Sequence, residues 1–90
     1  MSERLKPAVR ADLEYHELDD GGVVCDPLAD RIHTLNLTAA YVWSRLDGSR
    51  SIEQIATELH EITGVSIQTA VTDVGLAVER FQDEGLLQRP

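Results

Sequence analysis

The side chains that most often carry out catalysis or bind metals are few in this sequence and widely separated. His16, His33 and His60 lie in different segments, and the single cysteine, Cys25, belongs to no spacing typical of metal ligands. The sequence has no glycine-rich phosphate loop and no nucleophile elbow, and its scattered Ser and Thr residues are better explained as helix caps. We therefore expect a protein without catalytic activity, metal or cofactor.

Length and charge narrow the possible partners. Ninety residues fit one small domain, for which an open groove is a more natural site than an enclosed one. Sixteen acidic and eight basic residues give a net charge of −8, which opposes binding to nucleic-acid phosphates but is compatible with a peptide partner. A lone Cys25 and the lack of a long apolar segment predict a soluble cytoplasmic protein that makes no membrane contact.

The N-terminal part predicts a flexible arm followed by a small sheet. Residues 1–11 have no hydrophobic period, so we expect a loosely held arm ahead of one domain at residues 12–88. Turn-forming residues at 19–22 and 27–30 separate the predicted strands, which are residues 13–18, 23–26 and 31–35. In the third strand, alternation places Ile32 and Thr34 on one side and Arg31, His33 and Leu35 on the other.

A helix is predicted immediately after the third strand. Asn36 can accept hydrogen bonds from a first helical turn, and Gly48 is expected to end the helix. The intervening apolar residues recur at helical spacing and form one face: Ala39, Val42, Trp43 and Leu46.

Two more helices complete the pattern. Ser51 and Gln54 form a capping-box pattern, and the buried stripe of the second helix is predicted to be Ile52, Ile55, Ala56, Leu59 and Ile62. Ser66 is predicted to cap a third helix that runs to about residue 84. Its core face is predicted to be Ile67, Ala70, Val71, Val74, Ala77, Val78 and Phe81. Gly75 lies on the flank of that face, where close approach by another backbone would compensate for its low helix propensity.

The order of three strands and three helices predicts an α+β domain of the winged helix-turn-helix type, with a three-stranded antiparallel sheet. Two binding functions are compatible with this order. In a transcription regulator, the third helix would enter the DNA major groove, but no Lys or Arg precedes Arg80 on that helix, so charge argues against it. Alternatively, an extended peptide would pair with the edge of the third strand beside the third helix.

Four groups of residues form a recognisable pattern in order and spacing: Leu35, Asn36, Thr38 and Ala39; Trp43 with Leu46, Asp47 and Gly48; Arg50, Ser51, Ile52, Ile55 and Ala56; and Phe81, Glu84, Gly85, Leu86 and Leu87. With them the sequence resembles the PqqD family, the recognition elements of ribosomally made, modified peptides, and the likeness spans roughly residues 23 to 87. Leu37 stands where many relatives have Pro, and Trp43 is more typical of the lasso-peptide members.

The resemblance implies that the chain binds the leader segment of a precursor peptide as an added strand. It would present the leader to a modifying enzyme, such as a leader peptidase or a radical S-adenosylmethionine enzyme, in lasso-type or quinone-cofactor-type biosynthesis. Carried over by position, the expected peptide-binding residues are Arg31, Ile32, His33, Thr34, Leu35, Gln68, Val71, Thr72, Gly75 and Val78. A docking subunit that serves a neighbouring enzyme without binding a peptide remains an alternative.

Overall fold

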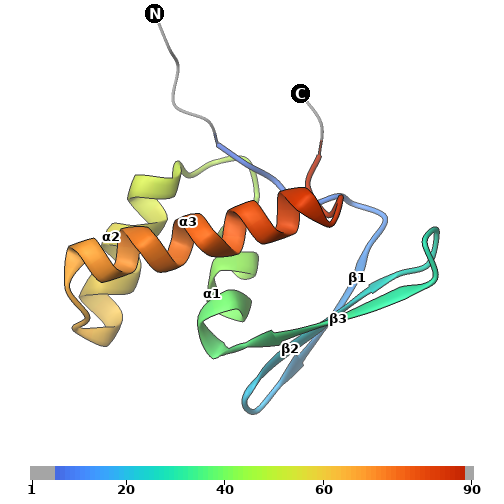
Figure 1. The fold of residues 1–90 in the computed structure, drawn as a ribbon, viewed down its shortest axis with the longest axis horizontal. Helices are drawn as coiled ribbons and strands as arrows, with labels where there is room; N and C mark the ends of the chain where they lie inside the picture. The colour runs from blue at the N-terminus through green and yellow to red at the C-terminus, as the bar shows by residue number, and fades with distance from the viewer. Residues whose placement is uncertain (1–5, 89–90) are drawn as a thin grey trace, which may run out of the picture.

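The computed structural model describes residues 6–88, and its elements follow the predicted order of three strands and three helices. Their bounds are β1 (Glu14–Leu18), β2 (Gly21–Asp26), β3 (Arg31–Asn36), α1 (Leu37–Arg45), α2 (Ile52–Thr63) and α3 (Ile67–Asp83). The strands form one antiparallel sheet in the order β1-β2-β3, which confirms the predicted α+β class. In Figure 1, α3 runs beside α2 and passes over α1, and α1 contacts both α3 and the sheet.

The second strand begins two residues earlier than predicted. Gly21 and Gly22, which we assigned to the turn, pair with both neighbouring strands, so the turn between β1 and β2 is shorter than expected. A β-carbon at Gly21 would collide with the Leu35 carbonyl, and one at Gly22 would collide with the Tyr15 ring. The two glycines therefore let neighbouring groups approach a strand more closely than a side chain would permit.

The third strand alternates as predicted. His33 and Leu35 are buried on the side that faces the helices, whereas Ile32 is 72% exposed on the opposite side and Thr34 is also exposed. The Arg31 side chain lies on the same side of the strand as that of His33, but it is exposed because Arg31 is at the start of the strand. Side chains thus alternate between the two sides along all of β3, and the core buries His33 and Leu35 on the inner side.

The first helix begins as predicted and ends earlier. The Asn36 side chain accepts a hydrogen bond from the Ala39 N–H at 2.8 Å, which confirms the predicted cap. The expectation that Gly48 ends the helix is wrong, because α1 stops at Arg45 and the Leu46 N–H closes the last turn on the Trp43 carbonyl. Gly48, with φ of 85°, lies in the following loop.

The helical pair of α2 and α3 is longer than the core beneath it. The Ser51–Gln54 capping box is confirmed, and Gly64 joins the helices with φ of 78°. The predicted burial of Ile62, Ile67 and Val71 is wrong, since these side chains are 65%, 42% and 42% exposed. They lie in the last turn of α2 and the first turns of α3, where the two helices extend past α1 and the sheet (Figure 1).

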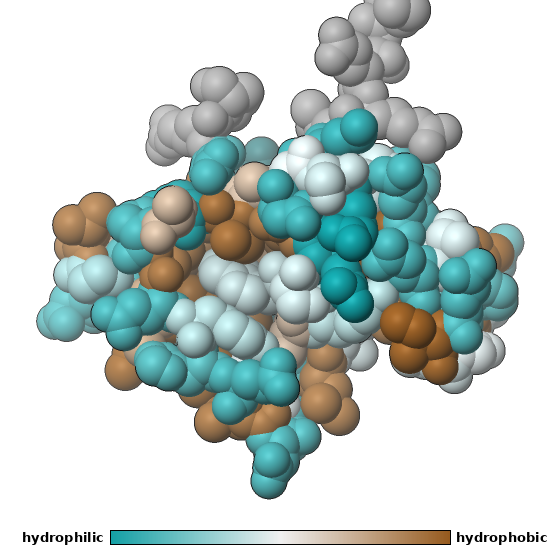
Figure 2. All heavy atoms as spheres, turned by 180° about the vertical axis from the view of Figure 1, so that it is seen from behind, coloured by the Kyte–Doolittle hydropathy of each residue, from teal (hydrophilic) through white to brown (hydrophobic). Residues whose placement is uncertain are grey.

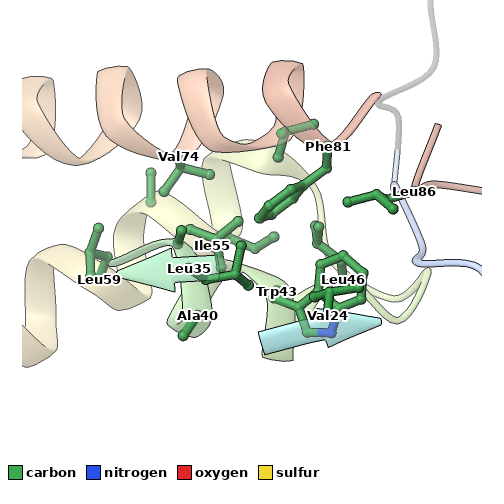
Figure 3. Close-up of a cluster of buried hydrophobic side chains, with 14 of the residues drawn as sticks. Val24, Leu35, Ala40, Trp43, Leu46, Ile55, Leu59, Val74, Phe81 and Leu86 are labelled. Atoms are coloured by element: carbon green, nitrogen blue, oxygen red, sulfur yellow. The ribbon is translucent and has the colours of Figure 1, made fainter. Parts of the chain in front are cut away.

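The core lies between the inner face of the sheet and the three helices (Figure 3). Trp43 is at its centre, with its ring centroid 5.2 Å from that of Phe81 in an edge-to-face arrangement and 6.1 Å from that of Tyr15 in a stacked one. The other large apolar side chains that are fully buried are Val24, Val42, Leu46, Ile55, Val74 and Leu86. This packing fixes the position of β3 relative to α3.

Part of the segment predicted to be a loosely held arm is hydrogen-bonded to the domain. The Val9 N–H donates to the Leu46 carbonyl at 2.9 Å, and the Gln88 N–H donates to the Ala8 carbonyl at 2.8 Å. The Arg10 guanidinium also reaches the buried carboxylate of Asp26. Residues 1–5 of the predicted arm lie outside the described residues. Within residues 6–88, no helix is long and apolar enough to cross a membrane.

Candidate functional site

The outer edge of β3 offers unpaired backbone groups. All six residues of β3 pair with β2, and no strand among residues 6–88 pairs with its other side. The Thr34 carbonyl accepts a hydrogen bond from Arg80 Nη2 at 3.1 Å, so the Thr34 backbone groups point away from β2. Because backbone direction alternates along a strand, the N–H and C=O of Ile32 also point outward. This edge can therefore hydrogen-bond an additional strand.

The five predicted site residues on β3 differ in accessibility. Arg31, Ile32 and Thr34 present exposed side chains. His33 and Leu35 are only 6% and 5% exposed, and the backbone alternation directs their N–H and C=O groups towards β2. They support the strand from inside and cannot contact a ligand at the edge.

The side of α3 that faces β3 is identified by two contacts. Arg80 bonds to the Thr34 carbonyl, and Glu84 Oε2 lies 3.4 Å from His33 Nδ1. At about 100° per residue, Asp73 and Leu76 lie within about 40° of Arg80 around the helix axis. Leu76 is 59% exposed and Asp73 is half-buried. We call the outer edge of β3 together with Asp73, Leu76 and Arg80 the β3–α3 face.

By the same angular count, the predicted helix residues lie mostly on another side of α3 from Arg80. Gly75 lies nine residues before Glu84, which corresponds to about 180° around the helix. The same count places four residues about 120° to 180° from Arg80: Gln68, Val71, Gly75 and Val78. Thr72, about 80° from Arg80, lies between the two sides. The sequence identified the flanks of the core face but not which flank faces the sheet.

The side of α3 that carries Gly75 is open. A β-carbon at Gly75 would meet no atom within 4 Å, so no backbone among residues 6–88 approaches closely to compensate for this glycine. Gln68, Val71 and Thr72 line, with Ile67, a shallow hollow of about 450 Å³ near the start of the helix. Val78 is 7% exposed and belongs to the core. These residues therefore do not share one surface with β3.

A chain of polar groups joins β3 to the end of α3. Arg80 Nε donates to Glu84 Oε1 at 3.0 Å, and the other Glu84 oxygen lies beside His33. The Glu84 carboxylate is the acidic neighbour of His33, whose Nε2 is buried without a hydrogen-bond partner within the described residues. Sequence reasoning missed Arg80 and Glu84 as site residues. Their spacing of four on a helix indicated that they pair, but not that they contact β3.

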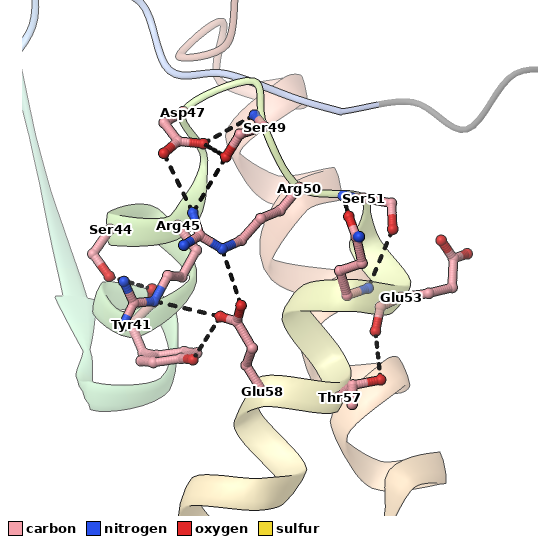
Figure 4. A network of polar contacts seen from close by, with 11 residues as sticks. Tyr41, Ser44, Arg45, Asp47, Ser49, Arg50, Ser51, Glu53, Thr57 and Glu58 are labelled. Atoms are coloured by element: carbon pink, nitrogen blue, oxygen red, sulfur yellow. Dashed lines mark hydrogen bonds and ion pairs between the residues drawn. The ribbon is translucent and has the colours of Figure 1, made fainter.

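A second polar network lies between α1 and α2 and does not reach β3 (Figure 4). Glu58 accepts hydrogen bonds from the Tyr41 hydroxyl at 3.1 Å and from Arg50 Nε at 3.0 Å. The hydrogen bond with Glu58 raises the pKa of the Arg50 guanidinium, and hydrogen bonds from Ser49 lower the pKa of the Asp47 carboxyl. These groups bond to one another across the connection between the two helices, so we assign the network to holding the α1–α2 loop.

Exposed hydrophobic side chains occur in several separate places. On the face opposite to that of Figure 1, Figure 2 shows separate hydrophobic patches between polar side chains. The large hydrophobic residues that are at least 42% exposed are Leu18, Leu28, Ile32, Leu37, Ile62, Ile67, Val71 and Leu76. Scattered exposure is ordinary in soluble proteins. Ile32 and Leu76 differ from the rest because both lie beside the outer edge of β3, Ile32 on the side of the sheet away from the helices and Leu76 on α3.

The family model of coenzyme PQQ synthesis protein D (PqqD) matches residues 21–87. The chain belongs to the PqqD family. The resemblance found in the sequence is thereby confirmed. No curated protein sequence matches the chain.

Solved structures of PqqD-like proteins share the fold. TbiB1 in complex with the TbiA(beta) leader peptide matches at 17% identity with a TM-score of 0.80, covering 92% of this chain and 96% of TbiB1. Lasso peptide synthetase B1 complexed with the leader peptide matches at 24% identity with a TM-score of 0.80. The match covers 93% of this chain and 99% of the synthetase chain. The PqqD part of Methylobacterium extorquens PqqCD, a stand-alone recognition element, matches at 22% identity with a TM-score of 0.65. The match covers 92% of this chain and 88% of the PqqD part.

Proposed function

We propose that this PqqD-family chain binds the leader segment of a ribosomally made precursor peptide as a fourth strand on β3, and presents it to a modifying or leader-cleaving enzyme. The observation that carries the proposal is the free outer edge of β3, where Ile32 and Thr34 direct backbone groups away from the sheet. Two solved structures with the same fold are complexes with leader peptides, which supports a peptide as the ligand.

The roles within the proposed site follow from position. Backbone pairing with β3 would supply affinity for an extended peptide, and contacts with side chains would supply sequence preference. The exposed side chains of Ile32 and Leu76 offer apolar contacts, and Arg31 is an exposed cation at the start of the strand. No carboxylate within residues 6–88 forms an ion pair with Arg31, so it is available to an acidic group of the leader.

The proposed role involves no reaction at this chain. Within residues 6–88, no three His, Cys, Asp or Glu side chains gather closely enough to hold a metal ion. The enzyme served would be a leader peptidase or a radical S-adenosylmethionine enzyme, and we place this step in the cytoplasm, which suits the unpaired Cys25. DNA binding is disfavoured by the first half of α3, which carries Asp73 and no basic residue before Arg80.

Proline substitutions on the two edges of the sheet test the proposal. Ile32→Pro removes an outward N–H from β3 without removing a bond to β2, so we expect leader affinity to fall by about tenfold or more. The same alternation directs the Glu17 N–H away from β2 on the β1 edge, so Glu17→Pro is the matched control and should retain the affinity.

The measurement is an amide chemical-shift titration with synthetic leader peptides encoded near the gene, with a scrambled peptide as the negative control. Equal loss of binding in both proline variants would show that the β3 edge is not the specific site. No binding of any leader by the unaltered protein, together with binding to a neighbouring enzyme, would instead establish the docking subunit.

A further inference from the structure

One of the outward acceptors on the β3 edge is already occupied. The Thr34 carbonyl accepts from Arg80 Nη2 at 3.1 Å, whereas no side chain within the described residues is hydrogen-bonded to the outward N–H or C=O of Ile32. An antiparallel strand added to β3 would place one of its own N–H groups on the Thr34 carbonyl. The peptide and Arg80 therefore compete for the same acceptor.

Arg80 is held in place by residues that do not belong to the edge. Its Nε donates to Glu84 Oε1 at 3.0 Å, and Glu84 Oε2 lies 3.4 Å from the buried His33 ring. The Arg80 side chain is nevertheless 41% exposed, and its bond to the Thr34 carbonyl lies at the surface. The guanidinium can thus leave the carbonyl for water without disturbing the core.

We infer that Arg80 is a latch on the β3 edge, which the N–H of a bound leader displaces from the Thr34 carbonyl. This inference rests on the proposed strand addition. In the free protein, Arg80 covers part of an edge that would otherwise be able to pair with a second sheet. In the complex, one leader N–H replaces Arg80 at the Thr34 carbonyl, so the leader gains little net affinity from this contact. A proline at that leader position has no N–H, so Arg80 stays on the carbonyl and the loss of affinity is small.

Removing the guanidinium tests the latch. Arg80→Met retains much of the aliphatic stem and removes the donors, so leader binding should become about threefold to tenfold tighter, the equivalent of one modest net hydrogen bond. Arg45→Met, which removes the same charge from α1, is the matched control and should leave the affinity unchanged. Both affinities are measured by calorimetry at one ionic strength.

A scan of N-methylated leader peptides locates the competing group. Methylating the amide that replaces Arg80 should cost little affinity in the unaltered protein, because Arg80 simply stays on the carbonyl. The same methylation should cost about threefold to tenfold more in Arg80→Met, where nothing replaces the lost donor. At every other leader position the cost should be equal in the two proteins.

The guanidinium resonances of Arg80 in the unaltered protein give a readout that needs no variant, and they should shift when leader saturates the site. Three results together would overturn the latch while strand addition still stands: Arg80 resonances that do not shift, Arg80→Met binding the leader no more tightly than the unaltered protein, and no position-specific difference in the scan. Failure of every leader to bind the unaltered protein would instead remove the proposed function on which the latch rests.

Discussion

The Gly75→Leu variant tests which side of α3 faces the leader peptide, because we expect it to change the stability of the protein but not its affinity for the leader. Gly75 lies inside the helix, its φ is not positive, and an added β-carbon meets no atom within 4 Å. The β-carbon of a leucine at this position therefore has room, and the gain in helix propensity amounts to about 0.8 kcal/mol relative to glycine. For a domain of this size, that gain raises Tm by about 3–6 °C.

Leader binding should not change in the same variant. Gly75 lies about 140° from Arg80 and about 180° from Glu84 around the helix axis, so a leucine side chain there points away from β3. Thermal unfolding followed by circular dichroism measures the first effect, and calorimetry with the leader peptide measures the second. The expected result is a more stable protein with unaltered affinity.

A loss of leader affinity by about tenfold or more in folded Gly75→Leu would refute this geometry. It would return the peptide to the side of α3 that carries Gln68 and Thr72, as the sequence alone predicted. A fall in Tm would instead show that the space beside Gly75 is filled in solution.

Three further predictions concern single side chains. Leu76→Lys removes an exposed apolar group from the β3–α3 face, so leader affinity should fall about fivefold to tenfold in calorimetry with Tm almost unchanged; unaltered affinity would exclude Leu76 from the site. Ser51→Ala removes the cap of α2 and should lower the free energy of unfolding by about 1 kcal/mol in urea titrations, whereas no loss would contradict the role of the capping box. Burial raises the pKa of the Asp26 carboxyl, but hydrogen bonds from the Ala29 backbone and from Arg10 outweigh this, so the net pKa is lowered. Asp26 therefore stabilises the fold above its unfolded pKa of about 4, and this contribution is lost as the pH falls through the folded pKa. Asp26→Asn should be less stable than the unaltered protein at pH 7 and converge with it in acid, and a constant difference at all pH values would contradict the ionised role.

Local sequence signals predicted the fold well where they act through nearby residues. Asn36 and Ser51 cap the helices that follow them, because each cap bonds to an N–H only three residues away. The alternation of β3 predicted which side chains face the core, since a strand packed on one face must repeat every two residues. These elements carry most of the family resemblance.

Burial at the ends of helices could not be predicted from periodicity. Ile62 and Ile67 fit the apolar stripes of their helices, yet both are exposed where α2 and α3 extend past the core. A stripe shows which side of a helix faces inward, but not how far the facing elements extend. The lengths of α1 and the sheet decide this, and they act through tertiary packing.

The choice between the two flanks of α3 was undetermined for a similar reason. The core face has one flank near Gly75 and another near Arg80, and both carry polar and small residues. Which flank lies beside β3 depends on how α3 crosses the rest of the domain. The hydrogen bond from Arg80 to Thr34, between residues 46 positions apart in the sequence, settles the orientation, and no local pattern encodes it.

The most direct test of strand addition is a set of intermolecular nuclear Overhauser contacts between labelled protein and unlabelled leader peptide. The proposal predicts contacts from leader backbone protons to the amide protons of Ile32 and Thr34, with further contacts to the methyl groups of Leu76. Contacts to the β1 edge near Glu17, or to the hollow beside Ile67 and Val71 without any to β3, would contradict it.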